Sequence, residues 1–379
     1  MVSSISAFGA ESTQTGIHHH YQAPRPLGMG DAFVAVANDY STLFYNPAGL
    51  ARLENGQINA SMDFSGSSSI VKFAKDVSDL GSATYADDNA KYQAFGNFLQ
   101  DKYGSHYSGR FGLFEGMWVR PNWGIAVLPM DMTVEMEIHN QGAPAIDYRA
   151  YLDTTLAYGY GADIKGVPGR LSWGTTVKFV NRGYSAKQFT ALDLVADSNL
   201  FKKEDLREGY TVDVDLGMLY TPDLPAEGIF SMLRLAKPTF GAVIRNVADY
   251  GFGSSLKLIN KTPGQAPEKL YRVIDIGTKW EYPSLWIFGG RGVLDIRDIM
   301  HPYFNTRRAL HLGFEFDWSV ASWWKGQYRV GLNQGYLTGG LSALFTVFRL
   351  DLVTYGEDVG YYNAPKENRI YMAKFNIDI

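Results

Sequence analysis

The sequence predicts an all-β fold, a transmembrane antiparallel β-barrel of about fourteen strands. Three observations lead to this prediction. Apolar and polar residues alternate with a period of two over most of the chain after residue 57, which is the pattern of strands with two different faces. Long and short connections between these segments tend to alternate along the chain. The composition combines 14% aromatic residues, 40 glycines and 20% charged residues, which suits amphipathic strands and many turns.

The alternation is clearest in two segments. From Leu310 to Trp318 every even position is large and apolar and every odd position is small or polar. The segment from Thr211 to Tyr220 repeats this pattern. Many such segments reach the roughly 9–11 residues that a tilted strand needs to cross a bilayer. The predicted strands cover approximately 57–65, 107–120, 122–133, 147–162, 169–183, 209–222, 237–249, 269–282, 285–297, 309–319, 325–335, 338–346, 347–356 and 367–379.

The connections predict which end of the barrel faces which side of the membrane. Five are long and polar, namely 66–106, 134–146, 184–208, 250–268 and 298–308, whereas those near Pro121-Asn122, Lys165 to Pro168 and Pro283-Ser284 are tight turns. Long loops at one end and short turns at the other are typical of an outer-membrane barrel with a periplasmic N-terminus. The connection 223–236 departs from this rule and has an apolar run from Phe230 to Leu235. Residues 86–103 have helical spacing, and we expect a helix beside the extracellular mouth.

Aromatic residues gather at the ends of the predicted strands. They are Trp118, Trp123, Trp173, Trp280, Tyr282, Trp286, Trp318, Trp323 and Trp324. Aromatic rings at these positions are expected to lie at the depth of the lipid headgroups. The alternative, in which they fill the core of a soluble protein, fits poorly with sustained alternation over fourteen segments.

Composition excludes several classes of protein. The net charge of -4 and the absence of a dense basic stripe give no electrostatic footprint for nucleic acid. No cysteine is present, which excludes disulfides and thiolate chemistry. No run of roughly 18 apolar residues predicts a transmembrane helix. The first ten residues lack the basic and apolar regions of a signal peptide, but Ser6 to Ala10 is similar to the end of a cleavage site. We therefore expect a native precursor with a signal peptide that is absent or trimmed here.

Two motifs occur before the first predicted strand. Arg25-Pro26-Leu27-Gly28-Met29-Gly30 begins the first, and Tyr45-Asn46-Pro47-Ala48-Gly49-Leu50 lies in the second. Together they resemble the start of the FadL/PorV superfamily of bacterial outer-membrane barrels, and they are closer to its PorV-like branch. The resemblance implies that the N-terminal segment folds into the lumen as a plug. We therefore expect a plug in residues 1–55, a barrel in residues 56–379, and a location in the bacterial outer membrane.

The residues of the plug motifs have physical roles of their own. Gly28 and Gly30 permit positive φ or close approach of two backbones. Pro47 keeps Asn46 out of the helical region, and the Asn46 side chain can bond to nearby backbone groups. The expected plug or gate residues are Leu27, Gly28, Met29, Gly30, Asn46, Pro47 and Ala48.

No motif predicts an enzyme, a cofactor site or a metal site. A Gly-x-Ser-x-Gly elbow, a Walker loop and His-Glu-x-x-His are all absent. Three consecutive histidines, His18 to His20, are expected to form a solvated tract. Polar residues on the inner strand faces are expected to pair across strands with cations such as Arg291, Arg297, Arg349 or Lys374. The lumen-facing candidates are Asp213, Asp215, Asp275, His311, Glu315, Asp317 and Arg329.

Two functions are consistent with these features. The first is non-enzymatic uptake or passage of small hydrophobic molecules past the plug, which the resemblance to FadL implies. The second is a PorV-like docking barrel that binds a secretion-system or surface protein through its periplasmic face or its extracellular loops. For that role the loops to consider are 66–106, 184–208 and 250–268. The expected partners are outer-membrane lipid and either a hydrophobic ligand or a protein.

Overall fold

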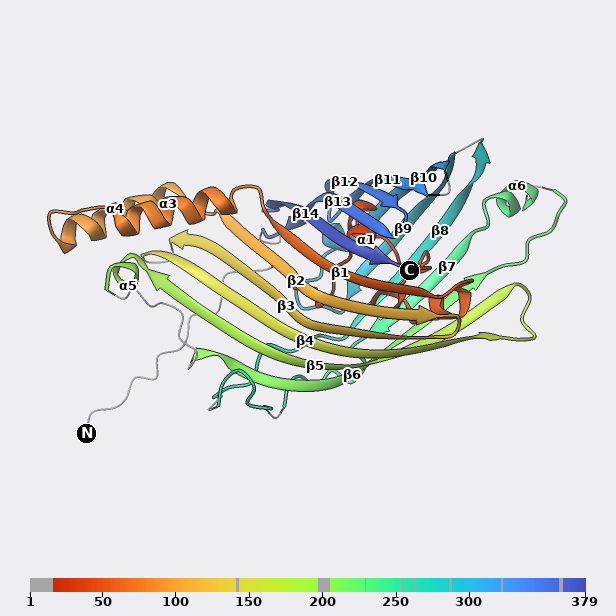
Figure 1. Cartoon of the computed structure of the whole chain (residues 1–379), viewed down its shortest axis with the longest axis horizontal. Coiled ribbons are helices and arrows are strands. Elements are labelled where there is room, and N and C mark those ends of the chain that lie inside the picture. The colour runs from red at the N-terminus through yellow and green to blue at the C-terminus, as the bar shows by residue number, and fades with distance from the viewer. Residues whose placement is uncertain are drawn as a thin grey trace.

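The computed structural model describes residues 16–140, 143–196, 205–228, 230–253, 255–261, 264–285, 288–321, 323–360 and 364–379. In this part of the chain fourteen antiparallel strands form a closed barrel, in which β1 also pairs with β14 (Figure 1). The predicted fold class is confirmed. The strands are β1 (Gln57–Ser67), β2 (His106–Arg120), β3 (Trp123–Asn140), β4 (Pro144–Ile164), β5 (Arg170–Thr190), β6 (Arg207–Thr221), β7 (Thr239–Arg245), β8 (Val273–Leu285), β9 (Phe288–Ile299), β10 (Leu310–Ala321), β11 (Trp324–Asn333), β12 (Tyr336–Phe345), β13 (Phe348–Asp358) and β14 (Glu367–Asp378).

The two faces of the barrel wall differ in polarity. In β10, His311 and Glu315 are buried inside the barrel, whereas Leu310 and Phe316 are exposed on its outer face. Outward-facing residues of the other strands are also apolar, among them Ile58, Phe64, Ile125, Leu156, Val177, Leu216, Ile244, Leu294, Val330, Leu350 and Phe375. This arrangement is the inverse of that in a water-soluble protein and matches a wall that contacts lipid outside and polar groups inside. The fold is that of a transmembrane barrel.

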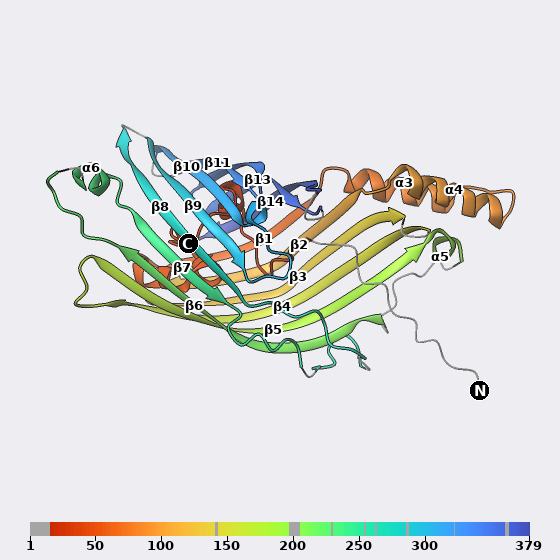
Figure 2. The same cartoon turned by 180° about the vertical axis from the view of Figure 1, so that it is seen from behind.

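Strands β3, β4 and β5 extend well past the others, as Figures 1 and 2 show. They contain 18, 21 and 21 residues, about twice the length that crosses a bilayer. The predicted long connections 134–146 and 184–208 were therefore wrong in part. β3 and β4 leave only 141–143 between them, and β5 continues to Thr190. The polar residues of these segments favoured loops in the prediction. Beyond the membrane, however, both faces of a strand can be polar, so a strand can continue there.

Three helices cover the outer face of this extension. They are α3 (Ile70–Ser82), α4 (Asp88–Asp101) and α5 (Ala191–Ala196). Their apolar residues form one cluster with outward-facing wall residues, whose buried members are Phe73, Phe95, Leu99, Tyr107, Ile138, Ile146 and Ala191. The cluster removes from water an apolar wall surface that lies beyond the lipid. α4 lies within the predicted helix 86–103, and α3 was not predicted. None of the helices in the described residues is long and apolar enough to span a membrane.

The end of the barrel with α3, α4 and α5 is called the loop end here, and the opposite end, with Gln57 and Ile379, the turn end. Turn-end connections are short, except for residues 222–238, which contain α6 (Phe230–Leu235). The predicted turn at Pro283-Ser284 lies within β8 instead. A further short helix, α7 (Thr306–Ala309), precedes β10 at the loop end.

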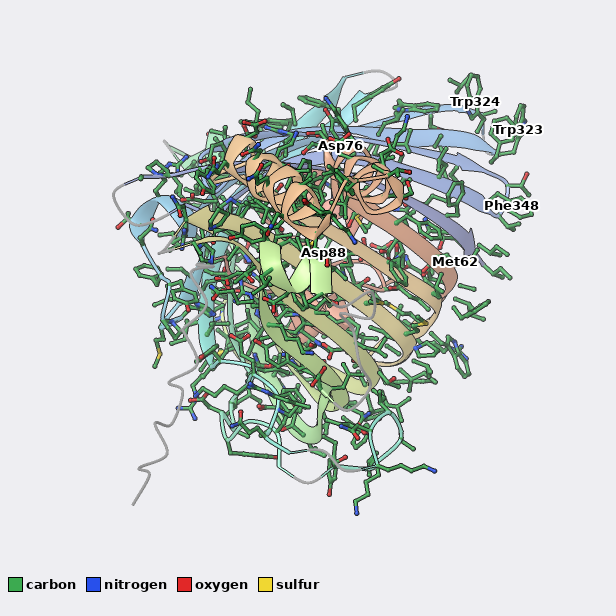
Figure 3. The ribbon with its side chains drawn as sticks, turned by 90° about the vertical axis from the view of Figure 1, so that its left-hand side faces the viewer. Met62, Asp76, Asp88, Trp323, Trp324 and Phe348 are labelled. Carbon is green, nitrogen blue, oxygen red and sulfur yellow. The ribbon has the colours of Figure 1, made fainter. Side chains whose placement is uncertain are left out.

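Aromatic residues surround the turn end. All the predicted strand-end aromatics except Trp286, which is outside the described residues, belong to turn-end parts of the wall or to the turns themselves. Trp318 contacts Trp324 edge to face, and Trp323 contacts Phe345 in the same way. Figure 3 shows Trp323, Trp324 and Phe348 pointing away from the barrel. Such a ring of aromatic side chains marks the level of the headgroups.

The N-terminal segment lies inside the barrel (Figures 1 and 2). It contains α1 (Pro24–Gly28), α2 (Thr42–Tyr45) and the 3₁₀ helix η1 (Pro47–Arg52). Between residues 21 and 53, all residues except Asn38 and Arg52 are buried. Residues 1–15, including the proposed cleavage-site sequence Ser6 to Ala10, are outside the described part of the chain.

Candidate functional site

The element Leu27-Gly28-Met29-Gly30 lies against strands β10 to β13. Its two apolar side chains are fully buried. A Cβ atom on Gly28 would lie 3.2 Å from the Cα of Gly340, and one on Gly30 would lie 2.3 Å from a carbonyl oxygen of β11. Gly30 also has a φ of +67°, which favours glycine. Glycine occurs at both positions because the backbone of the segment touches the wall directly.

Arg25 connects this element to the wall through buried charges. Its guanidinium donates two hydrogen bonds of 2.8 Å to Glu315 and one of 2.6 Å to Asp39. Arg329 donates to the same Glu315 carboxylate at 2.8 Å. Charge-assisted hydrogen bonds of this kind are stronger than neutral ones and fix geometry. The predicted candidates Glu315 and Arg329 are thus brought together around a residue of the N-terminal segment.

His311 and Asp317 flank this cluster on the same strand. His311 Nδ1 is 2.7 Å from the carbonyl oxygen of Gly30, inside the barrel. Asp317 is only half-buried, pairs with Arg291 at 2.9 Å and accepts a hydrogen bond from Gln327. His311 therefore contacts the N-terminal segment, whereas Arg291 and Gln327, the two partners of Asp317 named here, both belong to the wall.

A second set of contacts joins the segment to β9. The backbone N–H groups of Phe33 and Val34 donate to one carboxylate oxygen of Asp295 at 2.6 and 2.8 Å. Arg297 donates to the Asp31 carbonyl at 2.7 Å and forms an ion pair with the Asp31 carboxylate. Asp295 was not among the residues predicted from the sequence. Alternation in β9 placed its side chain inside, but no local signal indicated the backbone groups that it binds.

Asn46, Pro47 and Ala48 form a turn that rests on β5 and β6. Asn46 Oδ1 accepts a hydrogen bond from the Ala48 N–H at 3.1 Å, as the sequence suggested. Its Nδ2 donates to the carbonyl oxygens of Val34 at 2.8 Å and of Met218 at 3.2 Å. A single side chain thus joins two parts of the segment to each other and to the wall.

The remaining lumen-facing candidates lie on the β6–β8 side. Asp215 pairs with Lys178 at 2.8 Å, and Asp213 accepts a hydrogen bond from the backbone of residue 248 at 2.9 Å. Asp275 forms an ion pair with Arg245. All three carboxylates are buried inside the barrel. Among these partners none belongs to the N-terminal segment, so the seven candidates do not form a single site.

The three histidines are not a solvated tract, contrary to the prediction. His18 approaches Glu135 at 3.7 Å and stacks on Tyr151, His19 pairs with Asp298 at 2.9 Å, and His20 pairs with Asp153 at 3.2 Å. Burial lowers the pKa of His18 and His20. The carboxylates come from three different strands, so the histidines hold the segment across the loop end of the lumen. Within the described residues no group of side chains is arranged to hold a metal ion.

Cavities lie on both sides of the N-terminal segment. At the loop end the three histidines line part of a cavity of about 70 Å³. At the turn end a larger vestibule of about 550 Å³ is lined by charged residues: Arg25, Asp39, Arg291, Asp317, Lys325, Arg349 and Asp378. A third space, a groove of about 680 Å³, lies over β12 to β14 and reaches Phe64 of β1, and it is lined by Gly339, Gly340, Arg329 and mainly apolar residues such as Leu341. The N-terminal segment therefore lies between two compartments inside the barrel, the loop-end cavity and the turn-end vestibule.

One strip of the inner wall is apolar. Met117 of β2, Ala126 of β3 and Ala157 of β4 are direct neighbours in the strand register and are buried inside the barrel. Aromatic residues of the segment belong to the same apolar cluster, including Tyr21 and Phe44, whose stacked rings are 4.4 Å apart. The strip continues with Val119 and Leu128. An apolar strip is unusual in a barrel whose other inner residues are largely charged or polar.

The fold and the site together define a transmembrane barrel whose lumen is occupied by its own N-terminal segment. No family model matches the chain, and no curated protein matches it. Solved structures that are similar to it over nearly the whole of both chains include the following three. The Pseudomonas putida toluene transporter TodX has a TM-score of 0.48 and 10% identity, covering 96% of this chain and 99% of that one. The Ralstonia pickettii toluene transporter TbuX has a TM-score of 0.46 and 10% identity, covering 94% and 98%. The monoaromatic hydrocarbon channel CymD has a TM-score of 0.47 and 10% identity, covering 94% and 97%.

Proposed function

We propose that this chain is a non-enzymatic, FadL-like barrel of the bacterial outer membrane that passes small hydrophobic molecules past its N-terminal segment. The observation that carries the proposal is the apolar strip between Tyr21 and Phe44 of the segment and Met117, Ala126 and Ala157 of the wall. A channel for ions has no need of such a strip, because ions pass most easily along polar walls. Apolar solutes gain free energy from it as they leave water.

The N-terminal segment is the gate in this proposal. The histidines hold it on the loop-end side of the barrel, and Arg25 holds it on the turn-end side. It separates the loop-end cavity from the turn-end vestibule. Leu27 to Gly30 and Asn46 to Ala48 are its contacts with opposite sides of the wall. Passage therefore needs a movement of the segment or an opening in the wall.

The groove at Gly339 and Gly340 is a suitable place for such an opening. Neither residue has a side chain, and Gly28 of the segment lies directly behind Gly340. The groove faces the lipid and is lined largely by apolar residues. A hydrophobic molecule that leaves the strip through this part of the wall would enter the membrane without crossing water.

Uptake of radiolabelled toluene, chosen as a small apolar probe, tests the proposal. Met117→Gln and Ala157→Ser place polar groups in the strip and are expected to slow uptake at least about fivefold, since burying an unpaired polar group costs on the order of 1–3 kcal/mol. Thr211→Val is the matched control, because Thr211 is also buried inside the barrel but lies outside the strip. Deleting residues 24–50 is expected to change the flux as well. Unchanged uptake in all these folded variants contradicts the proposal.

The groove has its own test. Gly339→Leu fills it with a side chain, because only Thr354 lies within 4 Å of a Cβ at this position. Gly116→Leu is the control, since Gly116 is a β2 glycine where a Cβ would also meet nothing closer than 3.9 Å. Slower uptake is expected in the first variant alone. If Gly339→Leu and Gly116→Leu take up toluene at equal rates, the groove is not part of the route, and the proposed role of the strip is unaffected.

A PorV-like docking role is the second candidate. It is favoured by the helical layer at the loop end, because α3 and α4 pack on the barrel wall beyond the lipid and α3 exposes Val71, which is 80% accessible. Replacing residues 68–105 by a short turn between β1 and β2 tests it. Crosslinking in native outer membranes should lose a stoichiometric protein partner in this variant while toluene uptake persists. If uptake is lost and no partner differs, the docking role is wrong.

A further inference from the structure

His18 is held in the barrel more weakly than its neighbour His19. His19 pairs with Asp298 at 2.9 Å, whereas His18 Nδ1 is 3.7 Å from Oε1 of Glu135, which is longer than a hydrogen bond. The Nε2 atom of His18 is buried and has no hydrogen-bond partner in the described part of the chain. The His18 ring stacks on Tyr151, with ring centroids 3.8 Å apart and an interplanar angle of 4°. Stacking is therefore its principal contact.

Tyr151 is fixed by contacts that do not involve His18. It lies on β4 with its side chain buried inside the barrel. Its hydroxyl group donates a hydrogen bond of 2.8 Å to Glu268. The guanidinium carbon of Arg182 and the ring centroid of Tyr184 each lie 5.1 Å from the centroid of the Tyr151 ring. The Tyr151 ring is therefore expected to keep its orientation when His18 moves away from it.

The N-terminal segment is anchored by the residues that follow His18. Arg110 of β2 donates hydrogen bonds to the carbonyl oxygens of His19 and His20, at 3.0 and 2.9 Å. The His20 ring pairs in addition with Asp153 at 3.2 Å. Uncovering Tyr151 therefore requires the displacement of His18, while the segment stays attached to the wall from residue 19 onward.

A ligand on Tyr151 would lie close to the apolar strip. His18 and Tyr151 both line the loop-end cavity, and so do Tyr21 and Phe44, which belong to the apolar cluster of the strip. His18 also lines a second cavity of about 30 Å³. Displacement of its ring gives a ligand more room than the loop-end cavity alone, at a position next to the strip.

We propose that the face of Tyr151 covered by His18 is a binding site for a planar aromatic molecule with an O–H or N–H donor, of the class of phenols and indoles. His18 occupies this site with a ring of the same kind, since imidazole is planar and has an N–H group. This inference rests on the proposed function and narrows it, because it names molecules that enter the barrel at the loop end.

A free ligand can make better contacts in this site than His18 makes. Oε2 of Glu135 is 3.0 Å from Arg149, and Oε1 is the oxygen that faces His18 at 3.7 Å. A ligand that is not tied to the chain can bring its donor within hydrogen-bond distance of Oε1, and hydrogen bonds to a carboxylate are stronger than neutral ones. It can also shift its ring sideways, because aromatic pairs prefer offset stacking.

Binding of p-cresol and of toluene tests the proposal, because the two molecules differ by one hydroxyl group. Equilibrium dialysis of each radiolabelled compound against the purified barrel in detergent, with a detergent blank, gives the Kd. The Kd of p-cresol is expected to be at least about fivefold lower than that of toluene. Tyr151→Leu is expected to weaken the binding of both by about three- to tenfold. Tyr151→Phe is the matched control, because it keeps the ring and removes only the hydroxyl group.

His18→Ala is expected to change binding in the opposite direction. Both compounds should bind at least about threefold more tightly, because they no longer compete with the His18 ring. The chain has no cysteine, so a single nitroxide label at residue 17 reports the displacement directly. Saturating p-cresol should raise the mobility of this label, and it should do so at a higher concentration in Tyr151→Leu. Heat-modifiable migration on gels verifies that each variant has folded.

Three outcomes overturn the proposal: equal Kd values for p-cresol in Tyr151→Leu and Tyr151→Phe, unchanged or weaker binding in His18→Ala, and equal Kd values for p-cresol and toluene. Toluene uptake by the strip variants separates this proposal from the proposed function. If uptake slows in Met117→Gln but Tyr151→Leu binds p-cresol as Tyr151→Phe does, only the site on Tyr151 is wrong. If binding depends on Tyr151 but uptake is unchanged in every strip variant, the transport role is wrong and the binding site remains.

Discussion

Arg25 and Glu315 form a two-point ion pair inside the barrel, in which two guanidinium nitrogens each lie 2.8 Å from a different carboxylate oxygen. The pair joins the first helix of the N-terminal segment to β10, 290 residues further along the chain. Glu315 also accepts from Arg329. The position of the segment therefore depends on buried ion pairs. Removing one partner of such a pair leaves an uncompensated charge inside the barrel, which is strongly destabilising.

Glu315→Gln is expected to destabilise the protein by about 3–5 kcal/mol, because it leaves Arg25 and Arg329 buried with one carboxylate fewer. Chemical unfolding of the purified barrel in detergent measures this loss. Asp317→Asn serves as the comparison: Asp317 is half-buried and pairs with Arg291, so its loss should cost less than about 1 kcal/mol. Similar losses in both variants contradict the role assigned to Glu315.

Gly30→Ala is expected to displace the N-terminal segment from β10 and β11. The new Cβ would lie 2.3 Å from a wall carbonyl oxygen, at a φ of +67° that alanine disfavours. The result should be a higher ion leak across planar bilayers. Gly96→Ala is the control, because Gly96 is on α4 and a Cβ there meets nothing within 4 Å. An unchanged leak in Gly30→Ala indicates that the segment tolerates the shift.

Lys374→Met is expected to cost about 3–5 kcal/mol of unfolding free energy. Lys374 is fully buried, donates a hydrogen bond to Glu115 and lies 3.7 Å from Asp63. Without it two neighbouring carboxylates remain in the wall with one cation fewer. The double variant Lys374→Met with Glu115→Gln should recover part of the loss, because the second change removes one of these charges. A double variant less stable than the single one contradicts this account.

The connection between β9 and β10 is expected to loosen in acid. Burial lowers the pKa of His301 to about 4, and its Nδ1 accepts a hydrogen bond from the Tyr303 N–H at 3.1 Å. The unfolded connection binds the proton near pH 6.5, so stability is complete above that pH and falls between 6.5 and about 4, by roughly 2 kcal/mol at pH 5. Hydrogen exchange of residues 300–305 at pH 7.5 and pH 5 measures this change. His301→Asn should make the exchange, corrected for its intrinsic rate, independent of pH over this range.

The count of strands and their inward and outward faces could be read from the sequence. Alternation is a local property, so Leu310 to Trp318 shows its two faces without any knowledge of the neighbouring strands. The same locality explains the errors. A strand that continues above the membrane, such as the end of β5, loses the lipid-facing half of the pattern. Its polar residues then have the composition of a loop.

The candidate site was only partly predictable. Gly30 and Asn46 were singled out because their backbone requirements are local. The partners of His18, His19 and His20 were not predicted, since Glu135, Asp298 and Asp153 lie 117 to 279 residues away in the chain. Asp295 was missed because what it binds is backbone, which has no sequence signature.

The sequence by itself determined that the chain forms an amphipathic antiparallel barrel, because strand periodicity is a local property of the sequence. Only the tertiary structure decided which buried charges meet and where the backbone of the N-terminal segment touches the wall. Closing fourteen strands into a ring brings Arg25 to Glu315 and Gly28 to Gly340. Such pairs depend on the register of the whole barrel, which no local pattern contains.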